Sequence, residues 1–238
     1  MSTETIKQVA TSVHVWRDDH GDNNPRDWDN LGTMCCNHRR YSLGDPGKHN
    51  MNADDVIDEV LSSEVKDKLE AWKDREYRKR VGPLEGKDYE VESAKLEKDF
   101  AEKRRAAFDE VAISLPLYLY DHSGITMNTT GFSCRWDSGM VGIIYITREK
   151  ILKEFSRKVL TKSLREKVLA SLKIEVETYD HHLTGAVYGF STKDAEGEVI
   201  DSCGGFFGYD HKASGLLDAV CESLPENDPL RDPNNWKE

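Results

Sequence analysis

The sequence predicts an α+β fold, with a mostly antiparallel sheet, flanking helices and a charged helical insertion. Strand-like segments occur on both sides of a helical region and are followed by helices, a hairpin and a last helix. That order differs from the regular alternation of strands and helices in parallel folds. Residues 51–110 hold 18 acidic and 13 basic side chains, whereas residues 140–147 are apolar almost throughout. We expect a single α+β domain over residues 1–238, with the insertion at about 51–110.

The first part of the chain predicts two strands and then two helices. Residues 11–16 alternate between polar and apolar side chains, which is typical of a strand. A short apolar run within residues 31–43 predicts a second strand. In residues 51–110, apolar residues recur at helical spacing on both sides of Gly82 and Pro83. This pattern predicts a helical hairpin, or two helices with a mobile link. The alternating charges are typical of a solvated surface.

Three further strands are expected in the middle of the chain. Residues 113–120 (ISLPLYLY) predict one strand, and Pro116 places it at a sheet edge or at a bulge, because proline cannot donate a ladder hydrogen bond. Residues 125–130 are expected to return as a second strand after a turn. Residues 140–147 predict a strand that is buried on both faces, because few polar side chains interrupt it.

Two helices are predicted after these strands, a short one at residues 148–155 and a long one at 161–183. The long helix has an apolar stripe at steps of three and four residues. Thr161 or Ser163 is expected to cap its first turn, and Gly185 suits its end. The stripe consists of Leu164, Val168, Leu172, Val176, Tyr179 and Leu183.

A hairpin and a final helix are predicted near the end of the chain. Residues 186–193 and 198–207 form strand-like segments that flank Asp-Ala-Glu-Gly, which is typical turn material. A helix is expected at about 213–223. The residues after it, about 224–238, contain three of the seven prolines and are expected to form an extended tail.

The net charge of −11 restricts the class of partner. It argues against direct nucleic-acid binding and against an anionic membrane surface, because both need an excess of basic side chains. It favours a protein partner with a basic face. The candidate partner-binding surface comprises the charged helices of 51–110 together with Asp18, Asp19, Asp22, Asp27 and Arg135.

The sequence predicts a soluble protein of the cytoplasm. It lacks an apolar run near the ~20 residues that a membrane-spanning helix needs. Its first residues, MSTETIKQVATSV, lack the apolar stretch of a signal peptide. The five cysteines form no CxxC pair, which is typical of a reduced compartment and signals neither a zinc ribbon nor a thioredoxin-type site.

One group of residues suggests thiol chemistry. Cys134 and His122 are candidates for a nucleophile and its base, and Asp121 or Asp137 is a candidate to orient the imidazole. The alternative is structural: Cys134 packs as a small apolar residue beside Trp136, and the two aspartates bond backbone amides of turns. We favour this alternative.

A second group, at the end of the long predicted helix, suggests a divalent metal. Asp180, His181 and His182 carry ligand-type side chains. Adjacent residues on a helix point about 100° apart, however, and histidines near a helix C-terminus also complement the helix dipole without a ligand. We therefore expect no metal and no other cofactor.

Several stretches resemble an uncharacterised family of bacteriophage and prophage proteins. The resemblance covers most of the chain outside the charged insertion and implies an accessory protein of a mobile element that acts on host machinery. Members of that family have Pro where this chain has Arg135, and Gln where it has Met140. The stretches are WDNLGTM (28–34), HRRYSLGD (38–45), LYLYDHSG (117–124), FSCRWDSG (132–139), VGIIY (141–145), EVETYD (175–180) and LTG (183–185).

Two functions are compatible with these features. The first, which we favour, is a phage-type accessory protein that binds a host protein, such as a defence nuclease or a CRISPR effector, and inhibits or redirects it. The alternative is a thiol- or metal-dependent hydrolase that acts on a nucleotide or another small substrate. The first function predicts a stable complex without turnover, whereas the second predicts that activity depends on Cys134 and His122.

Overall fold

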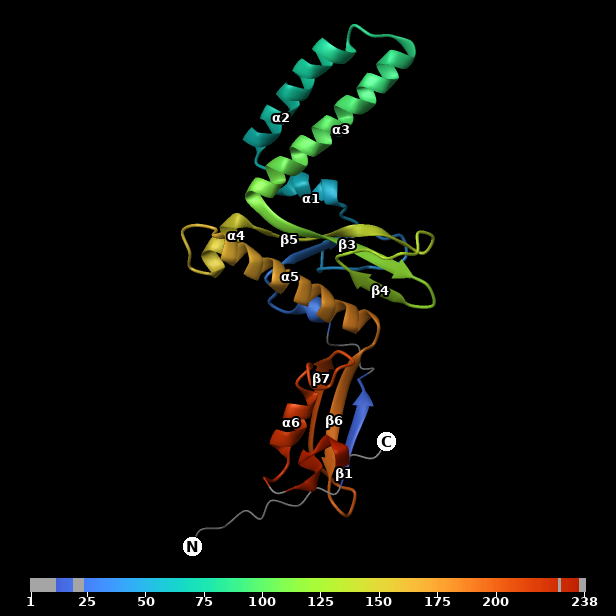
Figure 1. The fold of residues 1–238 in the computed structure, drawn as a ribbon, viewed down its shortest axis with the longest axis vertical. Helices are drawn as coiled ribbons and strands as arrows, with labels where there is room; N and C mark the ends of the chain where they lie inside the picture. Colours follow the sequence, from blue (N-terminus) through green and yellow to red (C-terminus); the bar gives the residue numbers. More distant parts are fainter. Residues whose placement is uncertain (1–11, 19–23, 227, 236–238) are drawn as a thin grey trace. The chain divides into compact units, whose positions relative to one another are not determined.

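The computed structural model describes residues 12–18, 24–226 and 228–235 and has the predicted α+β fold, with two antiparallel sheets and flanking helices (Figure 1). Its contacts group the chain into two compact units. The terminal unit comprises Met1–Trp28, Asp121–Met127 and Glu177–Glu238, and the central unit comprises Asp29–Tyr120 and Asn128–Val176. A single domain over residues 1–238 stays a prediction.

A four-stranded sheet has the order β2 (Thr33–Cys36), β5 (Ser138–Thr147), β3 (Ala112–Asp121) and β4 (Ile125–Asn128). Strand β5 pairs antiparallel with both β2 and β3. Its residues from 142 to 146 are all buried. The predicted burial of this strand on both faces is confirmed, because neighbouring side chains of a strand point to opposite faces and both faces are covered.

Pro116 was predicted to place its strand at a sheet edge or at a bulge, and the bulge is confirmed. The register of β3 against β5 shifts between Leu117 and Tyr118, close after the proline. In the sheet, β3 lies between β5 and β4, but β4 has only four residues and follows the end of β3. A bulge tolerates a residue that donates no ladder hydrogen bond, so proline is compatible with this position.

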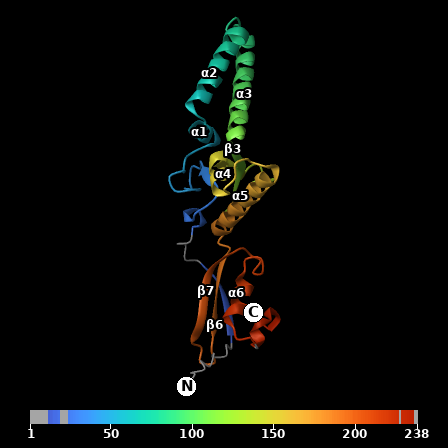
Figure 2. The ribbon, with the colours of Figure 1, turned by 90° about the vertical axis from the view of Figure 1, so that its left-hand side faces the viewer.

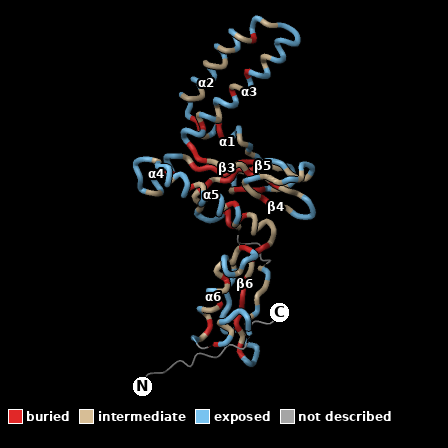
Figure 3. Tube along the Cα trace, in the orientation of Figure 1, coloured by how far each residue is buried: buried red, intermediate tan, exposed pale blue. Residues whose placement is uncertain are grey.

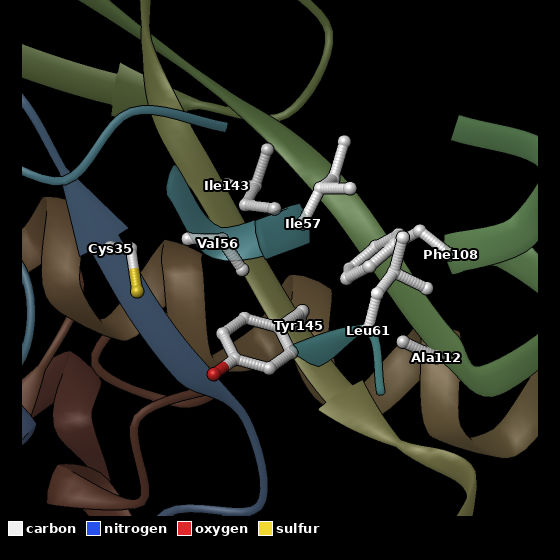
Figure 4. Close-up of a cluster of buried hydrophobic side chains, with 8 residues drawn as sticks. All are labelled: Cys35, Val56, Ile57, Leu61, Phe108, Ala112, Ile143 and Tyr145. Carbon is white, nitrogen blue, oxygen red and sulfur yellow. The ribbon is translucent and has the colours of Figure 1, made fainter. Parts of the chain in front are cut away.

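One face of this sheet packs against α1 (Ala53–Val60) and the last turn of α3 (Figure 4). Helix α1 begins with a capping box, in which the Asn52 side chain and the Asp55 side chain each accept a backbone N–H of the other residue. Side chains from β2, α1, α3, β3 and β5 thus form one apolar cluster. Its buried members are Cys35, Val56, Ile57, Leu61, Phe108, Ala112, Ile143 and Tyr145.

The opposite face of the sheet packs against α5 (Lys162–Leu183), which follows α4 (Arg148–Glu154). A Cβ on Gly32 would overlap the Leu172 side chain of α5 and lie 2.9 Å from Cδ1 of Ile144. Glu175 of α5 also accepts the backbone N–H of Leu31 at 2.9 Å and of Gly32 at 3.2 Å. Only glycine allows this close approach between the chain before β2 and the helix.

Helix α5 begins and ends where the sequence predicted, and the structure decides between its two candidate caps, Thr161 and Ser163. The Thr161 hydroxyl accepts the backbone N–H of Leu164 at 3.2 Å, so Thr161 caps the helix and Ser163 lies inside it. At the other end, Gly185 has a φ of +67° and donates its N–H to His182. The N–H of Ala186 bonds the carbonyl of His181, which completes a Schellman motif and confirms the predicted stop.

Most of the predicted insertion at 51–110 forms a helical hairpin, from α2 (Ser63–Glu76) through a π-helical turn (Tyr77–Val81) to α3 (Gly86–Val111), whereas its first part is α1, which packs on the sheet. The two helices lie side by side and extend away from the sheet in both views (Figures 1 and 2). Helix α2 buries no residue, and most of the hairpin is exposed or half-buried (Figure 3). Phe108 near the end of α3 belongs to the cluster on the sheet.

Charged contacts between its helices stabilise the hairpin. The Arg80 guanidinium bonds Glu92 at 2.8 Å and Asp99 at 2.7 Å. These contacts lower the pKa of the Glu92 carboxyl below its usual range. Lys103 lies 4.8 Å from the ring centroid of Trp72, a cation–π contact between α3 and α2. Val81, Leu96 and Phe100 are buried within the hairpin, so apolar packing stabilises the arm together with these charged contacts.

A three-stranded antiparallel sheet forms the body of the terminal unit, in the order β1 (Ser12–Arg17), β6 (Val187–Lys193) and β7 (Val199–Phe207). The predicted hairpin is confirmed: Asp194 in its turn accepts the backbone N–H groups of Glu196 and Glu198. Helix α6 (Leu216–Ser223) packs on the sheet through a cluster formed by Phe190, Leu216, Val220 and Leu224.

The tail after α6 differs from the extended chain that the prolines predict. Its described part contains two short 3-10 turns, Pro229–Arg231 and Pro233–Asn235. Leu230 packs against the cluster beneath α6. The Arg231 guanidinium donates to the carbonyl of Cys221 at 2.7 Å. Prolines fix φ near the value that a first turn requires, so here they start turns instead of extending the chain.

Candidate interaction site

The loop from Thr129 to Asp137, between β4 and β5, has a backbone fixed by its own short side chains. At its start, Asn128 Oδ1 accepts the backbone N–H of Thr130 at 3.0 Å and of Gly131 at 2.7 Å. Asn128 Nδ2 donates to the Gly131 carbonyl at 3.2 Å. Gly131 has a φ of +86°, which glycine adopts at little cost. The first half of the loop is therefore held in one conformation.

The second half of the loop is fixed by Cys134 and its neighbours. The Cys134 thiol donates to Oδ2 of Asp137 at 3.8 Å, and the Ser138 hydroxyl donates to the Cys134 carbonyl. The ring of Phe132 packs on Tyr120, with centroids 5.7 Å apart. These contacts give Cys134 and Asp137 roles within the loop.

Trp136 projects from this fixed loop into solvent. Its side chain is 96% exposed, which is rare for the largest apolar side chain. The sequence predicted that Cys134 packs beside Trp136. This prediction is wrong, because the Trp136 indole is in solvent. Arg135 is exposed next to it, and Met140 at the start of β5 is 49% exposed. We call Trp136 and its neighbour Arg135 the tryptophan patch.

Sequence reasoning named Arg135 of the tryptophan patch as a partner-binding candidate and missed Trp136. Trp136 lies in a stretch of small and polar residues, FSCRWDSG, without an apolar residue at strand or helix spacing. That lack of periodicity was the available signal that the indole has no place in a core.

The proposed pair of Cys134 and His122 stays a prediction. Asp121 and His122 belong to the terminal unit, whereas Cys134 and Asp137 belong to the central unit. His122 is exposed in the turn between β3 and β4, where its backbone N–H donates to the Gly124 carbonyl at 3.0 Å. The turn thus accounts for the backbone at His122 without a catalytic role.

Asp180, the first metal candidate, is bound by other parts of the terminal unit. Its Oδ1 atom accepts the Thr126 hydroxyl at 2.7 Å and the Met127 backbone N–H at 2.6 Å. Both donors lie in β4, so this carboxylate ties α5 to that strand. No group of three or more metal-ligating side chains that could hold an ion occurs among the described residues.

The two histidines beside Asp180 pack against aromatic rings. His181 meets Tyr209 edge-on, with centroids 6.3 Å apart, and His182 stacks on Tyr179 at 6.1 Å. Burial lowers the pKa of the His182 ring, although the charge of Asp27 acts in the opposite direction. The rings thus have packing partners on different sides of the helix, as their adjacent positions require.

A substitution at Asp180 separates a structural role from metal binding. We expect Asp180→Ala to lower the free energy of unfolding by about 1–3 kcal/mol, because it leaves two donors without their acceptor. Asp180→Asn retains an acceptor oxygen and should cost less. Thermal unfolding with and without added divalent metal measures both effects. A metal-dependent rise in the melting temperature that Asp180→Asn abolishes would contradict the structural role.

The buried cysteines are unsuited to thiol chemistry. Cys35 and Cys36 lie in β2 and are buried. Burial raises the pKa of the Cys35 thiol to about 12. This thiol is therefore protonated at neutral pH and acts as a small apolar side chain in the core.

The acidic excess lies almost entirely in one unit. The terminal unit has 19 acidic and 7 basic residues, whereas the central unit has 25 acidic and 26 basic residues. Residues 63–111, which contain the hairpin, are nearly balanced, with 14 acidic and 13 basic side chains. Attraction to a basic face therefore points to the terminal unit more than to the hairpin.

Of the four aspartates near the N-terminus that were predicted to bind a partner, the structure describes two. Asp19 and Asp22 lie outside the described residues. Asp18 donates its backbone N–H to Val187 at 2.8 Å, and Asp27 ends a 3-10 turn, Pro25–Asp27. Both residues belong to the acidic terminal unit.

In the described part of the chain, no helix is long and apolar enough to cross a membrane. Comparisons with family models, curated proteins and solved structures gave no match to this chain.

Proposed function

We propose that this chain is a phage-type accessory protein that binds a host protein in the host cytoplasm and inhibits or redirects it. The observation that carries the proposal is Trp136, almost fully exposed on a loop that its own hydrogen bonds hold in place. A defence nuclease or a CRISPR effector is the class of host protein that the phage resemblance suggests.

The two side chains of the tryptophan patch are of types that supply binding energy at interfaces. Interfaces depend on a few residues, among which Trp and Arg are enriched, and these residues insert into pockets of the partner. A large aromatic side chain offers 150–250 Å² of area and has only two rotatable side-chain bonds. Hydrogen bonds within the loop reduce the conformational entropy that is lost when it binds. The tryptophan patch therefore has the composition of a binding site.

Trp136→Ala tests this proposal. We expect the variant to bind the host partner about 30-fold or more weakly, which corresponds to a loss of about 2 kcal/mol. Wild type and variant would be immobilised at equal density, and host lysate proteins retained by each would be identified and then titrated as purified proteins. Stability should be unchanged, because Trp136 is 96% exposed.

The matched control is Ile174→Ala. Ile174 is 61% exposed on α5 in the same unit, so its truncation also removes an exposed apolar side chain. We expect it to leave partner affinity within about threefold of wild type. Equal retention of the same partner by wild type and Trp136→Ala would show that the tryptophan patch is not the binding site.

The alternative hydrolase is not favoured by a specific observation. Cys134 and Asp137 contribute to the loop that presents Trp136, and Asp180 bonds β4. That function stays a prediction from the residue types alone.

A further inference from the structure

We propose that the outer edge of β7 in the terminal unit accepts an extended, lysine- or arginine-rich segment of a partner protein as an added strand. This inference rests on the proposed binding function and names a class of partner segment for it. It concerns a surface separate from the tryptophan patch, so the two can fail independently.

Strand β7 has the geometry of an open edge. It is the last strand in the order β1, β6, β7, and within the described residues it pairs with β6 alone. Residues 199–204 are all exposed. An edge strand presents a row of backbone donors and acceptors that an extended segment can pair with.

One backbone N–H group of β7 has a local hydrogen-bond acceptor. The backbone N–H of Ser202 donates to the side chain of its neighbour Asp201 at 2.8 Å. A carbonyl of an added strand can replace this local acceptor. The Asp201 carboxylate is then available to a basic side chain of the incoming segment, where a charge-assisted contact forms.

The charge around the edge selects a basic occupant. Glu196, Glu198 and Asp201 are exposed in the β6–β7 turn and in β7. They belong to a unit with 19 acidic and 7 basic residues. A second copy of the chain is disfavoured, because pairing β7 with itself brings like charges together across the strands.

Exposed apolar side chains supply the remaining contact. Val199 and Ile200 are 57% and 37% exposed. The register of β7 against β6 shifts at Ile200 and again at Gly204 and Gly205, where Gly205 has a φ of +82°. The edge over residues 199–203 thus contains a bulge at Ile200, and its regular part is residues 201–203, about 10 Å long. A segment with alternating basic and β-branched residues matches it.

The test uses a fluorescent peptide of sequence Lys-Val-Lys-Val-Lys-Val-Lys and the full chain. The control peptide has the same sequence with every internal amide N-methylated, so it keeps the charge but cannot complete a β-ladder. We expect the unmodified peptide to bind at least about tenfold tighter by fluorescence anisotropy at about 50 mM salt, and more weakly at about 300 mM. Amide hydrogen exchange at residues 199–203 should slow when it binds.

Charge-reversal variants locate the site. We expect Glu198→Lys with Asp201→Lys to weaken peptide binding at least about tenfold. The matched control, Glu222→Lys with Glu226→Lys, changes exposed residues of the same unit by the same charge. It should weaken binding by less than about threefold. Trp136→Ala should leave peptide binding unchanged.

Three outcomes overturn the inference. Equal affinity for the N-methylated peptide would mean charge attraction without strand addition. Equal loss in both charge-reversal variants would mean that the edge has no special role. Absence of binding up to about 1 mM peptide would exclude a specific site, since a Kd of about 1 mM corresponds to a binding free energy of only about 4 kcal/mol. None of these results affects the test of Trp136.

Discussion

Gly142→Ala should destabilise the central unit by more than about 3 kcal/mol and disrupt the pairing of β2 with β5. A Cβ at this position would overlap the Cys35 carbonyl oxygen and lie 2.9 Å from both the Cys35 carbonyl carbon and the Cys36 Cα. These are backbone atoms, so relief requires the two strands to move apart. Because β5 is an interior strand of the sheet, that movement affects the sheet and the helices on both of its faces.

The same strand supplies the control. Gly139 is also in β5 and pairs with Leu119, but a Cβ there would meet no atom within 4 Å. Urea unfolding followed by circular dichroism should give Gly139→Ala a free energy of unfolding close to that of wild type. Similar values for the two alanine variants would contradict the close approach of β2 to β5.

Phe108→Ala should lower the free energy of unfolding by about 3–5 kcal/mol. Phe108 is fully buried at the end of α3, and its ring lies 6.1 Å from that of Tyr145 (Figure 4). It is one of the few residues through which the hairpin contacts the sheet. Its removal leaves a cavity at the place where α1, α3 and β5 meet.

Val91→Ala is the matched control for Phe108→Ala, since Val91 lies on the same helix and is 55% exposed. We expect that control to change stability by less than about 0.5 kcal/mol. Chemical unfolding of both variants, followed by circular dichroism and by tryptophan fluorescence, gives the comparison. A cost at Phe108 as small as that at Val91 would mean that the hairpin is not anchored through this ring.

Local signals predicted most of the elements. The apolar stripe of residues 161–183 predicted α5 nearly to the residue, because helical periodicity and the glycine at its end are local properties. The turn residues at 194–197 predicted the β6–β7 hairpin for the same reason. Pro116 predicted an edge or a bulge without separating the two, because both produce the same signal in the sequence, and the structure has the bulge.

The candidate site was predicted less well. Arg135 was named as a partner-binding candidate and Cys134 with Asp137 as catalytic candidates, but Trp136 was assigned to packing. In the structure, Cys134 and Asp137 bond within the loop, and the indole is in solvent. Residue types indicate which chemistry is available, but the direction in which a loop side chain points depends on hydrogen bonds such as those of Asn128.

The sequence by itself determined the fold class, the order of the elements, the charged hairpin and the overall negative charge. Each of these follows from composition or from spacing over a few residues. Only the tertiary structure decided that β3 lies between β5 and β4, that Trp136 is exposed and that β7 pairs with β6 alone among the strands of the described residues. It also assigned the acidic excess to the terminal unit, which is assembled from three separate stretches of chain. These properties depend on which distant segments pack together, and burial, charge density and strand pairing all follow from that packing.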